Sequence, residues 1–224
     1  MSQNIAVETL NEQEVKKNVV ARTLEGRLLS ASQCAYKIQP LYFRAAGFLP
    51  GPNVKRISRS INSVLIGRTI DGIVLAFRGT VNSFLDWFQN IATSVLVSPF
   101  QQGKVHGGFY QAVKSLWDDG IMKVVKDLIT EARSKGESEK IYLTGHSKGG
   151  AMAIIGATMF TKMMNYNVSG VYVFGSARVG DVKFQEWYNS NLGSITFAYE
   201  NNLDLVPFLP PSPSDKSTKS SNKR

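Results

Sequence analysis

A glycine-flanked serine is the first feature of this sequence with the composition of a catalytic site. The stretch YLTGHSKGG, residues 142–150, places Ser147 in a Gly-x-Ser-x-Gly pattern, between a short apolar run and a longer one. Glycines at 145 and 149 let the chain turn tightly and expose the serine hydroxyl. This pattern is typical of a serine nucleophile. The Lys148 amide, at the start of the expected helix, could then donate to an oxyanion.

Two downstream carboxylates compete for the role of an acid that orients a base and stabilises its charged form. Asp204 lies shortly after a strand expected at 194–200, at the edge where Ser147 should also emerge. Asp181 directly precedes the helical pattern VKFQEWYN, where an aspartate commonly caps a helix. We therefore expect Asp204 to be the acid and Asp181 to be a helix cap.

A second region with catalytic potential begins at AFRGT, residues 76–80. Thr80 stands just past an expected strand, where its hydroxyl could form the other half of an oxyanion hole or an ordinary strand-end turn. The segment that follows gathers Phe84, Leu85, Trp87 and Phe88 beside polar residues. Such an amphipathic segment fits a substrate-binding lid that meets lipid, and equally a packed connector helix.

The elements that must position these residues alternate along the chain. Apolar runs predict strands at 63–68, 73–79, 140–145, 170–176 and 194–200, the first two as a hairpin. Helical spacing is found over 12–42, 108–135, 148–164 and 181–189, with Gly120 as a break in the second of these helices. Because apolar strands alternate with helices, we expect an α/β fold: a mostly parallel sheet with helices on both faces.

Length and composition limit the domain organisation and the compartment. The 224 residues suffice for one domain, which we place at 1–210, and the Ser-, Pro- and Lys-rich residues 211–224 are expected to form a disordered basic tail. No stretch approaches the roughly 20 apolar residues of a spanning helix, and no secretory signal is recognised. We therefore expect no transmembrane segment and a cytoplasmic location, which the single cysteine, Cys34, also fits.

The charge pattern bears on partners. The formal net charge is +9, but the Lys and Arg residues of the body are scattered and form no dense run interleaved with aromatics. Nucleic acid is therefore not an expected partner. Peripheral contact with an anionic lipid surface stays open, beside the simpler reading of a soluble basic surface.

Six segments together resemble the class 3 lipases, the fungal-lipase-like branch of the α/β-hydrolases. They are FRGT, DWFQN, VHGGFYQA, YLTGHSKGGAMA, FGSARVGD and NNLDLVPFLPP. They stand in the family's order with similar separations over about residues 64–211, and an ordered set of six is far more specific than any single motif. The family hydrolyses carboxylic esters, often acylglycerols, through an acyl-enzyme, so the resemblance implies a lipid or small ester substrate and no metal or cofactor.

The resemblance also implies roles for individual residues. Ser147 is the nucleophile, Asp204 the triad acid, and Thr80 and the Lys148 amide the two oxyanion contacts, while the segment after Thr80 matches the lid. Lys148 stands where many relatives carry leucine. Its side chain is expected to be a solvated lysine at a helix start, or a cation that assists the oxyanion.

The base is the part of the triad without a candidate. In α/β-hydrolases the histidine follows the acid, yet no histidine follows Asp204. His146 adjoins the nucleophile, where neighbouring side chains point in different directions, and the family has His106 as a structural residue. We therefore expect neither to be the base. We expect a truncated C-terminal portion, so that part of the α/β-hydrolase sheet and its helices is missing; a degenerate homologue that only binds acyl ligands and an unusual base are the alternatives.

Overall fold

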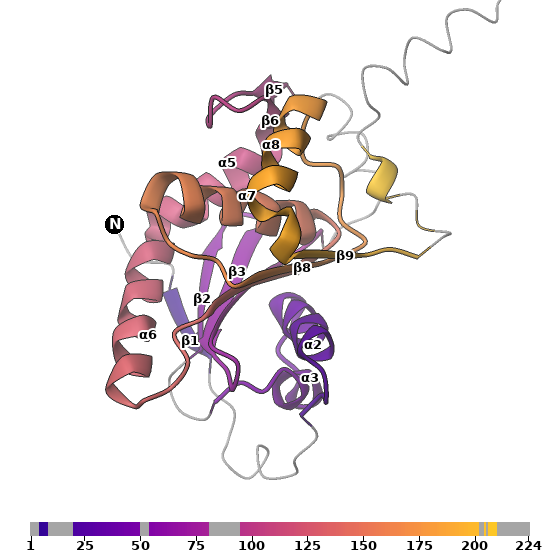
Figure 1. Ribbon diagram of the computed structural model, residues 1–224. Helices are drawn as coiled ribbons and strands as arrows, with labels where there is room; N and C mark the ends of the chain where they lie inside the picture. Colours follow the sequence, from indigo (N-terminus) through magenta and orange to yellow (C-terminus); the bar gives the residue numbers. More distant parts are fainter. Residues whose placement is uncertain are drawn as a thin grey trace, which may run out of the picture.

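A twisted central sheet organises the chain (Figure 1). The computed structural model describes residues 5–8, 20–49, 54–80, 95–201, 204 and 206–209, with the backbone alone for 5–8. Within these residues seven strands pair in the order β1-β2-β3-β4-β7-β8-β9. They are β1 (Ile5–Glu8), β2 (Val54–Arg59), β3 (Asn62–Arg68), β4 (Ile73–Phe77), β7 (Ile141–His146), β8 (Gly170–Phe174) and β9 (Thr196–Tyr199). A separate two-stranded ribbon joins β5 (Leu96–Val97) to β6 (Val105–His106).

The strand directions confirm the expected α/β class. Strands β4, β7, β8 and β9 are parallel neighbours. Strands β1 to β4 pair antiparallel in chain order, so β2 runs in the same direction as β4. The predicted hairpin is the β3–β4 pair. All five residues of β4 are buried, because its two faces are both covered.

Helices cover both faces of the sheet, as expected (Figure 1). One face carries α2 (Leu24–Tyr36) and α3 (Pro40–Ala45), which pack with β3, β4 and β7 in one hydrophobic cluster. The opposite face carries α5 (Gly107–Leu116), α6 (Met122–Ser134), α7 (Lys148–Met164) and α8 (Val182–Leu192), which share the larger core. Short helical turns lie at η1 (Trp117–Ile121), η2 (Gly193–Ile195) and η3 (Val206–Phe208).

The helix expected over 12–42 is shorter than predicted and divided into two. Helix α2 begins after Thr23, whose hydroxyl accepts the Gly26 amide at 3.3 Å. It ends before Pro40, the first residue of α3, because proline disfavours a helical conformation in the residue before it. Residues 12–19 lie outside the described part of the chain.

Strand β2 was not predicted, because its sequence VKRISR lacks the alternation of a half-buried strand. Its fully buried side chains, Val54 and Ile57, are three residues apart instead of two. The intervening Arg56 donates to the carbonyl oxygens of Ala35 at 2.7 Å and Cys34 at 3.0 Å. This arginine thus satisfies carbonyl groups that the end of α2 leaves without helical partners.

The break expected at Gly120 is confirmed. Gly120 has a φ of 121° within η1, and it divides the predicted helix at 108–135 into α5 and α6. The helix predicted at 148–164 coincides with α7.

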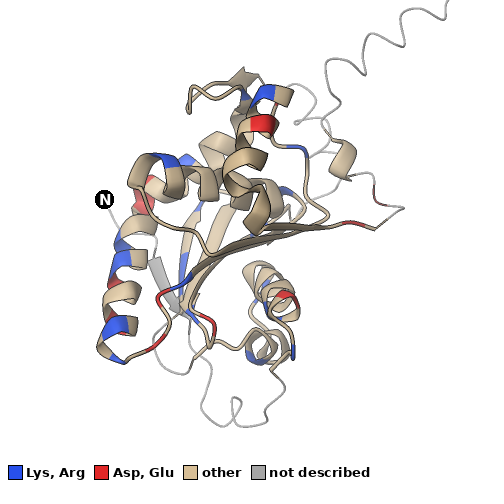
Figure 2. Cartoon of the chain, viewed as in Figure 1, with Lys and Arg blue, Asp and Glu red and all other residues tan. Residues whose placement is uncertain are grey.

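The outer surface of α6 carries charges of both signs (Figure 2). Two of its basic side chains form ion pairs with neighbouring acids, Lys123 with Asp127 at 2.8 Å and Arg133 with Glu139 at 2.6 Å, and Lys135, just past its end, pairs with Glu131 at 2.8 Å. Much of the positive charge on and beside this helix is therefore locally compensated. Among the described residues, no helix is both long enough and apolar enough to span a bilayer.

Candidate active site

Ser147 occupies a strained turn between β7 and α7. Its backbone lies at φ 58° and ψ −127°, a combination that residues other than glycine rarely adopt. The Ser147 amide donates to the Phe174 carbonyl at 2.9 Å, and the Ser147 carbonyl accepts the Gly150 amide at 2.9 Å. Such strain typically costs about 1–3 kcal/mol and persists where the surrounding structure enforces it. The sequence pattern and the backbone conformation therefore agree on a presented, half-buried serine.

Close backbone contacts explain the glycines that flank this turn. An ideal Cβ at Gly149 would lie 2.2 Å from the Phe77 carbonyl oxygen and 3.0 Å from the Gly79 nitrogen. An ideal Cβ at Gly145 would lie 2.2 Å from the Gly149 carbonyl oxygen. No larger residue fits at either position without moving backbone. Helix α7 can therefore start directly against the end of β4.

Thr80 lies at the same edge of the sheet as Ser147. Phe77 at the end of β4 pairs with Gly145 in β7, so the chain reaches Thr80 and Ser147 a few residues past adjacent strand ends. The Thr80 hydroxyl is buried, and it has no hydrogen-bond partner among the described residues. An unpaired buried hydroxyl costs roughly 1–3 kcal/mol, and such exceptions cluster at functional sites.

Lys148 is buried, which corrects the expectation of a solvated lysine. Only 8% of the residue is exposed, and its Nζ donates to Asn62 Oδ1 at 2.6 Å. Burial first, and then the nearby charge of Arg78, lower the pKa of Lys148 to about 8. The sequence could not show this, because Asn62 is distant along the chain and adjacent only through the sheet. The Lys148 amide is the first of α7, where helix amides lack intrahelical partners.

Because Lys148 is buried, we expect its charged form to destabilise the fold at neutral pH. Because its folded pKa is depressed, the unfolded chain holds more protons between about pH 8 and 10.5, and stability should rise with pH through that window. A shift of this size corresponds to about 3 kcal/mol, from which roughly 1 kcal/mol is subtracted for the Asn62 hydrogen bond. We expect Lys148→Met to raise the free energy of unfolding at pH 7 by about 2 kcal/mol, and to give essentially no gain at pH 10, where the parent lysine is mostly neutral in the folded protein.

Urea unfolding at the two pH values measures this effect. Lys126→Met is the matched control, because Lys126 is exposed on α6 and its replacement should change stability little at either pH. A methionine variant at 148 that is less stable than the parent at pH 7 would contradict the prediction.

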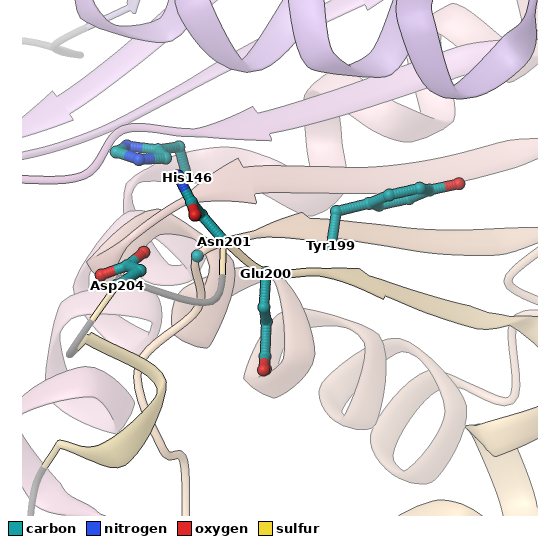
Figure 3. A pocket seen from close by; sticks show the side chains of 6 residues that line it. His146, Tyr199, Glu200, Asn201 and Asp204 are labelled. Carbon is teal, nitrogen blue, oxygen red and sulfur yellow. The ribbon is translucent and has the colours of Figure 1, made fainter.

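Asp204 lies beside a cavity of about 480 Å³ at the ends of β7, β8 and β9 (Figure 3). The cavity is lined by His146, Gly175, Tyr199, Glu200, Asn201 and Asp204. The His146 ring and the Asp204 carboxylate lie on the same side of the view in Figure 3, while the Tyr199 and Glu200 side chains extend away from them. Asp204 Oδ1 accepts the Val206 amide at 2.9 Å. The carboxylate is thus held at the edge of the sheet from which Ser147 also emerges.

The rival carboxylate, Asp181, has a structural role. Its side chain accepts the Phe184 amide at 2.9 Å and caps α8, as its position before the helical pattern predicted.

Neither histidine is hydrogen-bonded to Ser147 in the structure. His106 is 3% exposed, accepts the Phe109 amide at Nδ1 and stacks on the Phe109 ring. His146 Nδ1 lies 2.9 Å from the Tyr36 hydroxyl. Burial lowers the pKa of His146, and the charge of Asp204 partly opposes this shift.

The expected lid residues Phe84, Leu85, Trp87 and Phe88 lie outside the described part of the chain.

Tyr36 is a residue beside the site that the sequence did not indicate, because it stands 110 positions before His146, at the end of a helix. In the described ranges, no group of three or more His, Cys, Asp or Glu side chains is placed to hold a metal ion.

A mostly parallel sheet that carries a serine on a strained turn between a strand and a helix is the architecture of an α/β-hydrolase. Residues 74–214 match the family described as Lipase (class 3). This match spans more than half of the sequence, and the chain belongs to the class 3 lipase family.

Individual relatives agree with this membership. The chain is 30% identical to a secreted mono- and diacylglycerol lipase of Malassezia globosa, over 63% of this chain and 48% of that protein. It is 28% identical to a secreted mono- and diacylglycerol lipase of Penicillium camembertii, over 69% of this chain and 48% of the relative. The chain therefore spans about half the length of these relatives. Because both are named as secreted, the cytoplasmic expectation is wrong.

Solved structures share the fold. Lipase II from Rhizopus niveus superposes with a TM-score of 0.69 at 21% identity, covering 90% of this chain and 77% of that one. The lipase from Rhizopus microsporus var. chinensis superposes with a TM-score of 0.68 at 22% identity, covering 94% of this chain and 79% of the other. At such identities the likeness shows the α/β-hydrolase fold alone.

Proposed function

We propose that this chain carries the site of a serine-dependent hydrolase of carboxylic esters with acylglycerol-like substrates, which acts through an acyl-enzyme. The observation that carries this proposal is the strained conformation of Ser147 between β7 and α7. Strain of this kind has a cost and persists where function requires a presented side chain. Family membership supports the reaction class, and the names of the two relatives support mono- and diacylglycerols as substrates.

In this proposal the Ser147 hydroxyl attacks the ester carbonyl carbon and gives its proton to a base. The carbonyl oxygen becomes negatively charged, and the Thr80 hydroxyl and the Lys148 amide donate hydrogen bonds to it. The Thr80 hydroxyl has no hydrogen-bond partner in the part of the chain that the structure describes, which supports this role, because it can donate once substrate arrives. Collapse of the intermediate expels the alcohol, which takes a proton, and water then releases the acid and restores Ser147.

Asp204 is proposed as the acid that orients the base and stabilises its charged form. Its position beside an open cavity supports this assignment, because an imidazole could reach the carboxylate there. The two histidines of the 224 residues contact Tyr36 and Phe109 instead of Ser147. We therefore propose that the 224-residue chain, as printed, hydrolyses esters slowly.

The names of the relatives support a proposal about the compartment in which the reaction takes place. Because both lipases compared above are named as secreted, we infer an extracellular site of action. Peripheral contact with a lipid surface is part of the same proposal.

Turnover of p-nitrophenyl butyrate, with and without added imidazole, tests the proposed function. The 224-residue chain should be slow, and exogenous imidazole should accelerate it about tenfold, because a general base contributes roughly 10²–10⁴-fold in an enzyme. Asp204→Asn is the matched control: it keeps the shape of the side chain but loses the charge, so the imidazole effect should shrink.

A different result would change the assignment. Fast turnover without imidazole that disappears in His106→Gln or His146→Gln, at unchanged stability, would make that histidine the base. Absence of turnover in both conditions, together with saturable binding of a fatty acid, would favour the alternative function, a non-catalytic acyl-ligand or lipid-surface binding protein.

A further inference from the structure

Tyr36 reaches the candidate active site from the far end of the sequence. It is the last residue of α2, and its hydroxyl oxygen lies 2.9 Å from His146 Nδ1 and 3.4 Å from the His146 carbonyl oxygen. The same oxygen lies 2.0 Å from the ideal Cβ position of Gly79, so the hydroxyl fills the space beside that glycine. One phenol group therefore touches both the residue before Ser147 and the residue before Thr80.

Helix α2 holds this phenol in a fixed position. Near its start, Arg27 forms a two-point ion pair with Asp71 in the β3–β4 turn, through contacts of 2.7 Å each. In its middle, the Leu28 carbonyl accepts the hydroxyl of Thr144, two residues before His146 in β7, at 3.2 Å. The end of the helix is tied to β2 through Arg56. The helix that carries the phenol is thus fastened to the sheet, and in particular to the strand that presents Ser147.

The hydrogen bonds of the phenol bear on which nitrogen of the His146 ring carries the proton, because either atom of the 2.9 Å contact can donate and the phenol can also donate to the His146 carbonyl oxygen. Burial raises the pKa of Tyr36 to about 12, so the hydroxyl keeps its proton, and a hydrogen bond with the Gly79 backbone opposes part of this rise. If the phenol oxygen accepts from the Gly79 amide, its single proton is available for His146 Nδ1. A neutral ring that accepts at Nδ1 carries its own proton on Nε2.

The other ring nitrogen, Nε2, lies on the side of the ring that is near Gly175 and the Asp204 carboxylate. The ideal Cβ position of Gly175 lies 2.6 Å from Asp204 Oδ2 and 3.8 Å from His146 Nε2, so these two atoms border the same small space. An N–H at Nε2 would border the cavity that the Asp204 carboxylate also lines. The contacts therefore run continuously from Gly79 through Tyr36 and His146 to the Asp204 cavity.

We propose that Tyr36 is a positioning residue. Its hydroxyl holds in place the turn at Gly79, which leads to the proposed oxyanion donor Thr80, and it fixes the His146 ring with its proton on Nε2, the nitrogen nearer Asp204. This inference rests on the proposed function, since it assigns to Ser147 and Thr80 the chemistry that Tyr36 supports. Tyr36 does not touch the reacting atoms. It acts by keeping the turn that bears Thr80 in register with the turn that bears Ser147.

Tyr36→Phe tests this inference, because it removes only the hydroxyl. We expect covalent labelling of Ser147 by a fluorophosphonate to slow about tenfold, since a displaced oxyanion donor weakens transition-state stabilisation. We also expect the titration of His146, followed by NMR, to move to higher pH, because a hydrogen bond to neutral Nδ1 is lost. The chain has two histidines, so His146→Gln assigns the signal.

Tyr42→Phe is the matched control, since Tyr42 lies in α3 within the same helical layer and its variant should label and titrate like the parent. Labelling is measured at a temperature where circular dichroism shows every variant to be folded. An unchanged labelling rate and an unchanged His146 titration in Tyr36→Phe would overturn the inference. A parent chain that is not labelled at all would instead refute the proposed function, while the His146 titration would still report whether Tyr36 controls the ring.

Discussion

Ser147→Ala is expected to abolish the covalent fluorophosphonate adduct of this protein completely. The adduct requires an oxygen nucleophile, and the turn between β7 and α7 presents only this side chain at φ 58° and ψ −127°. Imidazole-supported ester turnover should fall by at least about 10²-fold, because removal of a serine nucleophile eliminates the acyl-enzyme route. Intact-protein mass spectrometry measures the adduct, and p-nitrophenyl butyrate measures turnover.

Ser176→Ala is the matched control for this experiment. Ser176 lies close to the start of α7, where its Cβ is 2.8 Å from the ideal Cβ position of Gly150, and its hydroxyl contacts the Ala177 carbonyl. It is thus a serine of the same region with a structural partner of its own. An adduct that persists in Ser147→Ala, or one that peptide mapping places on another serine, would refute Ser147 as the nucleophile.

Gly149→Ala is expected to destabilise the protein by about 3 kcal/mol or more and to eliminate labelling of Ser147. The new Cβ would lie 2.2 Å from the Phe77 carbonyl oxygen, and this atom belongs to the backbone of a buried central strand and cannot rotate away. Overpacking a well-filled interior typically costs about 1–3 kcal/mol, and a clash with rigid backbone belongs at the upper end. Relief of the clash would push α7 away from β4 and separate the Lys148 amide from Thr80.

Gly193→Ala provides the control for the loss of a glycine. An ideal Cβ there meets its nearest neighbour at 3.5 Å, an ordinary contact, and the backbone has a φ of −59° that alanine adopts freely. Denaturant unfolding should place this variant close to the parent. If Gly149→Ala is equally stable and labels normally, the tight approach of α7 to β4 is not required for the site.

The sequence by itself determined the local elements of this protein, including the turn that carries the proposed nucleophile. The apolar run of β7, the Gly-x-Ser-x-Gly turn and the apolar helix α7 are contiguous, so their order and type follow from local pattern and from sterics near Ser147. The cap at Asp181 and the break at Gly120 are equally local. Each of these features depends on interactions within a few residues, which a linear sequence displays directly.

The tertiary structure decided which distant residues share the site. Tyr36 contacts His146, which is 110 positions away in the sequence, and Lys148 donates a hydrogen bond to Asn62, which is 86 positions away. Adjacent strand ends and a packed helix bring these residues together. Strand β2 was not predicted for the same reason. Its polar residue Arg56 is accommodated because the guanidinium group donates hydrogen bonds to carbonyl oxygens at the end of α2. Burial and hydrogen bonding across the sheet are set by packing between elements, and residue type and spacing along the chain carry no record of them.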